Sequence, residues 1–341
     1  MALLATACGA AEKPSSQDDR AGLVFSRVNG DEWSVWVAEA DGSDARKVVA
    51  TGSVDGVSPD GRWLTYLKPY DEEGRLYLRD LETGTTRDLG PTMPLAWSPD
   101  GRTLATSNRS HLALVDAESG ASRKVAEGEV WHATFSPDGK AIAFAEGYAL
   151  EGNLRVLRLS DSYLSELAPG DDPVWGTSWI AFARWSIDDE LGKDYGAVST
   201  LYLIRPDGSG LHQLTIDEET AGQGKDDFLR YGLVPVAFSA DGKRLLAEVS
   251  MELGPMELVT FSVPNGPGRK LTGAEEEGAI WTADLSADGT RILFEDGGLD
   301  DEANHAIFTM PFQGGKRHLL ISNATQASWA RGIPSKTDSA E

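Results

Sequence analysis

The sequence predicts an all-β fold built from repeated antiparallel hairpins, and two observations support this prediction. A tetrapeptide of the form Ser-Pro/Ala-Asp-Gly occurs five times, beginning at Ser58, Ser98, Ser136, Ser239 and Ser286. Further alternating segments with Gly-containing turns separate the copies, as at 76–84. Two hairpins in about 40 to 45 residues have the size of one propeller blade. We therefore expect a β-propeller of seven four-stranded blades.

Each tetrapeptide is expected to form the tight turn between the first two strands of a blade. Proline fixes φ at the first central turn position, and glycine accepts the positive φ that closes the hairpin. Apolar segments lie on both sides of each copy, for example 95–97 and 103–106 around the second. Such units cannot bury both faces alone, so they must stack around a ring.

The predicted blades follow in order along the chain. Blade 1 is incomplete, with strands at 23–25, 33–37 and 46–48. Blades 2, 3 and 4 centre on the first three turns, and blades 6 and 7 on the last two. Blade 5 has no such turn, and its expected strands are 173–175, 179–182, 201–204 and 212–214. The last strand, 326–329, should supply the inner strand that blade 1 lacks, which removes two exposed sheet edges.

The Ser-Pro-Asp-Gly turn, with an aromatic-containing strand before it and a strand ending in Asp-Gly after it, resembles the TolB-like propeller repeat. The resemblance covers residues 22–330 and concerns the fold, because the motif is a hairpin and not a site. TolB itself has six blades, so six is the alternative count. We expect one propeller over 21–332, a disordered linker over 1–20 and a disordered tail over 333–341.

The first residues suggest where the protein resides. Small and apolar residues precede Ala7-Cys8-Gly9, and a polar stretch follows, which resembles the cleavage box of a bacterial lipoprotein signal. The resemblance implies lipidation at Cys8 and a lipid-anchored, exported protein, on the outer face of the cytoplasmic membrane or in the periplasm. The alternative is an Ala-rich start with an inert cysteine. Cys8 is the single cysteine, so no intrachain disulfide can form.

The charge balance excludes some classes of partner. The chain has 54 acidic and 31 basic residues among 341, a formal net charge of −23. A nucleic-acid binder needs basic surface, and so does a protein attracted to anionic lipids. We expect neither partner, and no membrane contact except through Cys8. We expect a monomer.

The surplus of acid lies in the connections at one end of the expected ring, densest over blades 5 to 7. Long connections on a rigid scaffold often carry function. The candidate partner-binding residues are Asp188, Asp189, Glu190, Asp194, Asp217, Glu218, Glu219, Asp226, Asp227, Asp300, Asp301 and Glu302, with the aromatic side chains Trp185 and Tyr195. They would attract a basic protein or peptide. A calcium site is one alternative, although no EF-hand spacing supports it, and a merely solvated surface is another.

No catalytic motif appears in the sequence. It contains no Gly-x-Ser-x-Gly elbow, His-Glu-x-x-His motif or phosphate-binding loop. The five histidines are scattered along the chain. His132 and His305 lie near strand starts and could point toward the end of the ring that carries the acidic connections. Five tryptophans at similar places in first strands, Trp97, Trp131, Trp175, Trp281 and Trp329, favour packing between blades.

We therefore expect a non-enzymatic binding scaffold of the cell envelope, without a cofactor. The alternative is a propeller enzyme or a carbohydrate-binding protein with a site at the central mouth, with or without a metal.

Overall fold

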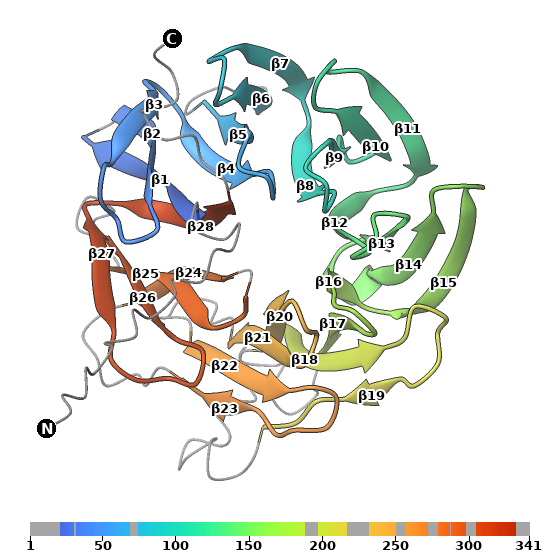
Figure 1. Cartoon of the computed structure of the whole chain (residues 1–341). Coiled ribbons are helices and arrows are strands. Elements are labelled where there is room, and N and C mark those ends of the chain that lie inside the picture. Colours follow the sequence, from blue (N-terminus) through green and yellow to red (C-terminus); the bar gives the residue numbers. More distant parts are fainter. Residues whose placement is uncertain are drawn as a thin grey trace, which may run out of the picture.

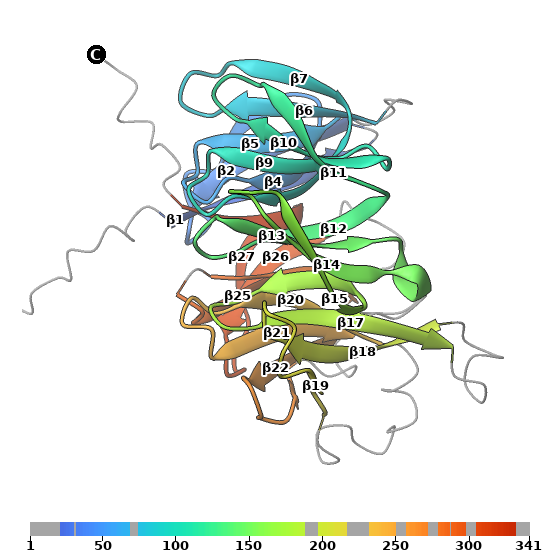
Figure 2. The same cartoon turned by 90° about the vertical axis from the view of Figure 1, so that its right-hand side faces the viewer.

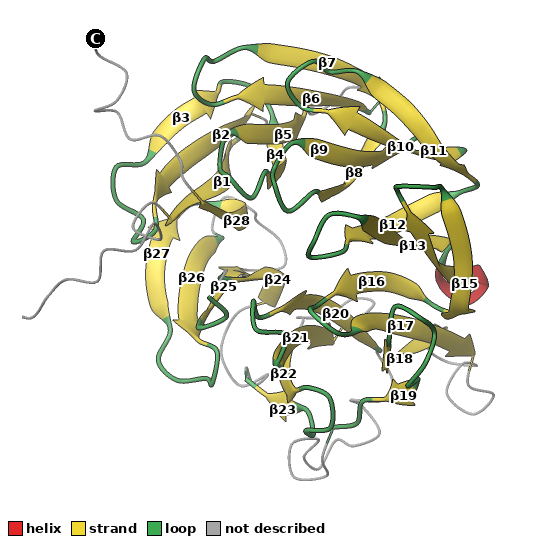
Figure 3. Cartoon of the chain, turned by 45° about the vertical axis from the view of Figure 1, so that its right-hand side comes forward, coloured by secondary structure: helices red, strands yellow, loops and turns green. Residues whose placement is uncertain are grey.

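The computed structural model is a ring of seven four-stranded antiparallel sheets, so seven blades is confirmed and six is excluded (Figure 1). It describes residues 21–30, 32–68, 74–187, 197–216, 232–249, 257–271, 279–286, 288–297 and 305–331. Regular structure is almost entirely strand, with one short 3-10 helix, η1 (Ala149–Glu151), in the described residues (Figure 3). No described helix has the length and apolar character needed to span a membrane.

The strands of the first four blades follow from the inner edge outward. Blade 1 contains β28 (Thr325–Arg331), β1 (Ala21–Asn29), β2 (Glu32–Glu39) and β3 (Arg46–Val49). Blade 2 contains β4 (Ser53–Val57), β5 (Trp63–Leu67), β6 (Arg75–Asp80) and β7 (Thr86–Pro91). Blade 3 contains β8 (Met93–Trp97), β9 (Thr103–Ser107), β10 (His111–Asp116) and β11 (Ser122–Glu127). Blade 4 contains β12 (Val130–Phe135), β13 (Ala141–Glu146), β14 (Asn153–Arg158) and β15 (Tyr163–Pro169).

The last three blades have the same order. Blade 5 contains β16 (Asp171–Trp175), β17 (Ile180–Ile187), β18 (Ala197–Ile204) and β19 (His212–Gln213). Blade 6 contains β20 (Leu233–Phe238), β21 (Arg244–Val249), β22 (Glu257–Ser262) and β23 (Arg269–Lys270). Blade 7 contains β24 (Ala279–Leu285), β25 (Arg291–Gly297), β26 (Ala306–Pro311) and β27 (His318–Ser322).

The ring closes as the sequence predicts. The C-terminal strand β28 pairs antiparallel with β1, with Leu23 opposite Trp329 and Val24 opposite Ser328. Blade 7 holds the same strand from the other side, since Asp284 accepts a hydrogen bond from the Trp329 backbone N–H at 2.9 Å. Both edges of the closing strand are therefore engaged.

The apolar core lies between neighbouring blades. One cluster joins Ala143 and Leu154 of blade 4 to Ile180 and Phe182 of blade 5, all fully buried. Because each cluster of this kind needs two blades, single repeats cannot fold alone and the ring must assemble as a unit.

The five first-strand tryptophans do not share one role, which corrects the sequence-based expectation. Trp97, Trp175 and Trp329 pack against buried clusters between blades. Trp131 and Trp281 lie near the beginning of their strands, at the other end of the ring, and Trp281 is exposed. Each stands five residues before its tetrapeptide turn, whereas Trp97 directly precedes one.

The tetrapeptide turns share one hydrogen-bond pattern. In the second copy Ser98 Oγ donates to Asp100 Oδ1 at 2.6 Å and accepts from the Thr103 backbone N–H at 2.9 Å. The other four copies repeat both bonds. The serine therefore fastens the turn to the first residue of the next strand.

Two ends of the ring differ in character (Figure 2). The short turns from first to second strand and from third to fourth lie at one end, here called the turn end. The connections from second to third strand and from blade to blade lie at the other end, here called the loop end. Every inner strand has a register shift in its pairing with the next strand. Such bulges re-aim side chains.

Candidate functional site at the junction of blades 4 and 5

Three side chains from two blades meet at the loop end and form what we call the blade 4–5 site: His132, Asp171 and Asp172. His132 Nδ1 lies 2.9 Å from Asp171 Oδ1 and 3.1 Å from Asp172 Oδ1. The Asp171 side chain is 1% exposed, whereas the His132 side chain is 39% exposed. The site therefore has a buried floor and an accessible imidazole.

The beginnings of two inner strands place these residues. His132 follows the bulge of β12, where the register shifts between Val130 and His132. Asp171 opens β16, whose register shifts between Asp171 and Val174. Just before it, a side chain on Gly170 would collide with the Phe182 ring, since an added Cβ would lie 2.3 Å from it. Glycine thus lets the chain pass close to the core before the two aspartates.

The backbone anchors both oxygens of the Asp171 carboxylate. Asp171 Oδ2 accepts the Ala149 N–H at 2.8 Å, and Asp171 Oδ1 accepts the Asp172 N–H at 2.8 Å. Asp172 and Ala149 both have positive φ, of 52° and 49°. Backbone conformations of this kind persist only where surrounding contacts hold them, and they gather at ligand sites.

The environment of the site raises the pKa values of Asp172, Glu248 and His132, so each of these groups binds a proton more readily. Burial raises the pKa of Asp172 to about 6, with His132 opposing and Asp171 adding to the shift. Burial also raises the pKa of Glu248 on β21 to about 7, and Asp172 adds to it. For His132, burial works against the imidazolium, but the hydrogen bond with Asp171 and the nearby carboxylates outweigh it and raise its pKa.

Aromatic and aliphatic side chains surround the acids. The rings of Trp131 and Tyr148 lie 5.3 Å apart, and the Tyr148 side chain is 59% exposed. Leu150 in η1 and Ile187 at the end of β17 are also exposed, and η1 contacts β17. The exposed Tyr148 ring lies 6.4 Å from the His132 ring, so acidic and apolar groups stand near each other, which suits a ligand with a cationic part and an apolar part.

His305, the other histidine that the sequence placed near a strand start, forms a buried pair with Glu295. Its Nδ1 lies 2.6 Å from Glu295 Oε1, and both side chains are buried. Glu295 also accepts hydrogen bonds from the Thr325 hydroxyl at 2.5 Å and the Gln326 backbone N–H at 2.7 Å. Its oxygens are engaged in joining blade 7 to β28, so this pair has a structural role.

Most of the predicted partner-binding residues lie outside the described residues. These are Asp188, Asp189, Glu190, Asp194, Tyr195, Asp217, Glu218, Glu219, Asp226, Asp227, Asp300, Asp301 and Glu302. Trp185 is described and lies on β17 at the blade 4–5 site. Its indole approaches Asp172 and opposes the rise in that pKa, although its Nε1 has no hydrogen-bond partner among the described residues.

Sequence reasoning singled out His132 and Trp185 but not the acids that face them. Because the sequence places the strand at 173–175, Asp171 and Asp172 look there like ordinary acids of a connection, whereas in the structure they begin β16. Only the position of His132 near a strand start pointed to this place. Asp171 is 39 residues further along the chain, and the contact exists because adjacent inner strands lie side by side.

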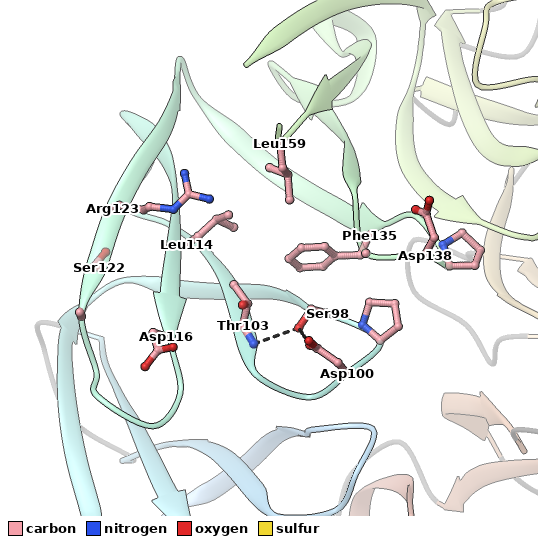
Figure 4. Close-up of a pocket in the computed structure, with 14 residues that line it drawn as sticks. Ser98, Asp100, Thr103, Leu114, Asp116, Ser122, Arg123, Phe135, Asp138 and Leu159 are labelled. Carbon is pink, nitrogen blue, oxygen red and sulfur yellow. Dashed lines mark hydrogen bonds between the residues drawn. The ribbon is translucent and has the colours of Figure 1, made fainter. Parts of the chain in front are cut away.

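A groove at the turn end is a weaker candidate (Figure 4). It has a volume of about 650 Å³ and lies between blades 3 and 4, where Leu114, Phe135 and Leu159 line it. Its polar residues are largely committed to the turns, as Ser98 and Asp100 bond each other at 2.6 Å. The groove is the space between the adjacent blades 3 and 4.

Comparison with known proteins supports the fold more than any activity. No family model matches the chain. One curated relative, Tricorn protease homolog 1 from Streptomyces coelicolor, is 32% identical over 149 residues. The match covers 42% of this chain but only 12% of that protein.

Solved structures show the same ring. TolB from Acinetobacter baumannii is 14% identical over 90% of this chain and 82% of its own, with a TM-score of 0.53. A prolyl endopeptidase is 13% identical over 93% and 49%, with a TM-score of 0.64. Oligogalacturonate lyase from Vibrio parahaemolyticus is 12% identical over 88% and 84%, with a TM-score of 0.59. At such identities the likeness shows the propeller fold alone.

Proposed function

We propose that the protein is a non-enzymatic binding scaffold of the bacterial envelope that holds a segment of a protein or peptide partner at the blade 4–5 site. A basic side chain of the partner would face Asp172 and Glu248, and an apolar one would pack on Tyr148. The net charge of −23 would draw a basic partner toward the protein.

One observation carries this proposal: among the described residues, no lysine or arginine side chain pairs with the acids of the site. No described lysine or arginine forms an ion pair with Asp171, Asp172 or Glu248, and His132 is the only described base beside them. Some other acids of the ring do have such a partner, as Asp80 has in Arg62 at 2.9 Å. A cationic group of the ligand could form the ion pair that no described lysine or arginine forms with these acids.

Export and lipid anchoring belong to the same proposal. They are supported by the cleavage-box resemblance around Cys8 and by the likeness of the ring to TolB. Labelling cells with a radioactive fatty acid tests this part. We expect label on the wild-type protein and none on Cys8→Ser; equal labelling of both would exclude the anchor.

Peptide binding tests the site itself. The probes are two labelled short peptides, one alternating Lys and Leu and one alternating Glu and Leu, followed by fluorescence anisotropy at low and high salt. We expect binding of the Lys peptide only, weakening with salt because exposed charges are screened. Tyr148→Ala and Glu248→Gln should each weaken it by about tenfold, since such anchors contribute about 1–2 kcal/mol.

A matched control separates the site from general effects. Tyr163 on β15 is exposed to the same extent as Tyr148, 59%, but lies on an outer strand. Tyr163→Ala should leave affinity unchanged. Equal binding of both peptides, or equal loss in both tyrosine variants, would contradict the proposal.

An enzyme is the second candidate, and one observation favours it. Buried Asp171 orients a half-exposed His132, an arrangement typical of general acid–base catalysis. Incubation with oligogalacturonate and with a peptide mixture, followed by mass spectrometry, tests it. A reaction product that the wild type forms and His132→Ala does not form would show that the protein is an enzyme and not a binding scaffold.

A further inference from the structure

We propose that His132, Asp171 and Asp172 bind one divalent transition-metal ion, of the class of Mn²⁺ or Zn²⁺. This proposal shares Asp172 with the proposed partner site but does not require a partner, because the metal ligands all come from this chain. The ligand atoms would be Nδ1 of His132 and one oxygen of each aspartate.

The spacing of these atoms suits a common cation. One nitrogen and two carboxylate oxygens lie within 4.8 Å of one another. His132 Nδ1 lies 2.9 and 3.1 Å from the two oxygens. Metal–ligand bonds of about 2.0–2.1 Å place neighbouring ligands about 3.0 to 3.3 Å apart. The two nitrogen–oxygen distances are thus within a few tenths of an ångström of the spacing that an ion requires.

The donor set selects among cations. Imidazole nitrogen suits zinc, iron and similar ions, and carboxylate oxygen suits manganese as well. Calcium prefers six to eight oxygen ligands, and the described site offers a nitrogen and few oxygens. We therefore expect a transition metal to bind more tightly than calcium, which was the cation considered from the sequence.

The site is organised before any ion arrives. Two backbone N–H groups fix the Asp171 carboxylate, and the bulge in β12 fixes the beginning of His132's strand. The Glu248 carboxyl group interacts electrostatically with Asp172. In its ionised form it adds negative charge near the three ligands, and a dication would relieve that repulsion.

The Glu295–His305 pair provides an internal comparison. It has the same kinds of ligand atom, but Glu295 accepts bonds from His305, Thr325, Thr282 and the Gln326 N–H. These donors saturate its oxygens, and both side chains are buried. At the blade 4–5 site, by contrast, the imidazole is half exposed, so coordination positions remain open to water.

Metal titration of the full chain tests the proposal. Isothermal titration calorimetry with MnCl₂, ZnCl₂ and CaCl₂ should show one tight equivalent for a transition metal and weaker binding of calcium. Asp172→Asn and His132→Ala should each weaken the tight equivalent by about tenfold to a hundredfold. Thermal unfolding without metal checks that each variant folds, and His132→Gln replaces His132→Ala if it does not.

Electron paramagnetic resonance of the Mn²⁺ complex provides a second readout. A nitrogen coupling from the imidazole should appear in the wild type and vanish in His132→Gln. The control is His318→Ala, which removes an exposed histidine on β27 and should change neither measurement. Several weak equivalents that all variants retain, or a tight equivalent without nitrogen coupling, would overturn the site. Neither result depends on peptide binding.

Discussion

Four carboxyl groups in the interior of the ring, Asp55, Asp172, Glu248 and Asp284, have pKa values raised to between about 6 and about 7. Burial is the largest cause for each, because surrounding blades displace the bulk water that stabilises a carboxylate. The Asp55 side chain keeps an accessible surface, but protein atoms crowd around it and this desolvation raises its pKa to about 7. Nothing in the local sequence distinguishes these acids from surface ones.

Replacing Asp55 with asparagine should change how stability depends on pH. The raised pKa means that the folded state favours the neutral carboxyl group. The stability it contributes is full at acid pH and is lost as pH rises from about 4 through about 7. Asp55→Asn stays neutral and can still accept the Thr65 hydroxyl, which lies 3.0 Å from Asp55 Oδ2.

Urea unfolding measures the difference. The midpoint of the wild type should fall relative to Asp55→Asn between about pH 4 and about pH 7. Glu118→Gln, at an exposed position of the turn end, should show no such divergence. Parallel curves for wild type and Asp55→Asn would contradict the raised pKa.

At the scale of the element, the repeated turn stabilises a hairpin and also contacts the next blade. Gly101 has φ of +70°, and a Cβ there would lie 2.7 Å from Asp60 Cγ in the turn of blade 2. The Asp60 carboxyl group is itself held by Ser58 at 2.5 Å. Glycine is therefore required at this position for two reasons: it adopts the positive φ, and its lack of a Cβ lets the neighbouring turns pack closely.

Gly101→Ala should destabilise the protein more than Gly30→Ala does. Gly30 also has positive φ, +60°, but nothing lies within 4 Å of an added Cβ. Both variants pay the left-handed penalty of about 1–2 kcal/mol, and Gly101→Ala adds an overpacking cost of about 1–3 kcal/mol. Chemical denaturation of both variants measures the difference, and equal losses would show that the contact between turns is unimportant.

At the scale of the whole molecule, the ring depends on how its last strand is held. β28 pairs with β1, and buried Glu295 binds Thr325 and Gln326 at its beginning. The clusters between blades couple each blade to its neighbours, so loosening one junction weakens the whole ring.

Glu295→Gln should lower the stability of the entire ring by about 1–3 kcal/mol. The amide has one acceptor oxygen where the carboxylate had two, so a buried donor loses its partner. Differential scanning calorimetry should show a lower Tm in a single transition. Glu166→Gln, on an exposed part of β15, should leave Tm unchanged. A Glu295→Gln protein as stable as the wild type would show that closure does not depend on this carboxylate.

The sequence by itself determined the number of blades, their order and the way the ring closes. These properties come from local turn chemistry and strand alternation, which repeat and can be counted. It also indicated the loop end and singled out His132 and Trp185. Only the tertiary structure decided that His132 faces Asp171 and Asp172 while His305 is saturated by Glu295 and its neighbours. Such contacts join residues from different blades, and their distances depend on how the ring packs, which no single repeat encodes.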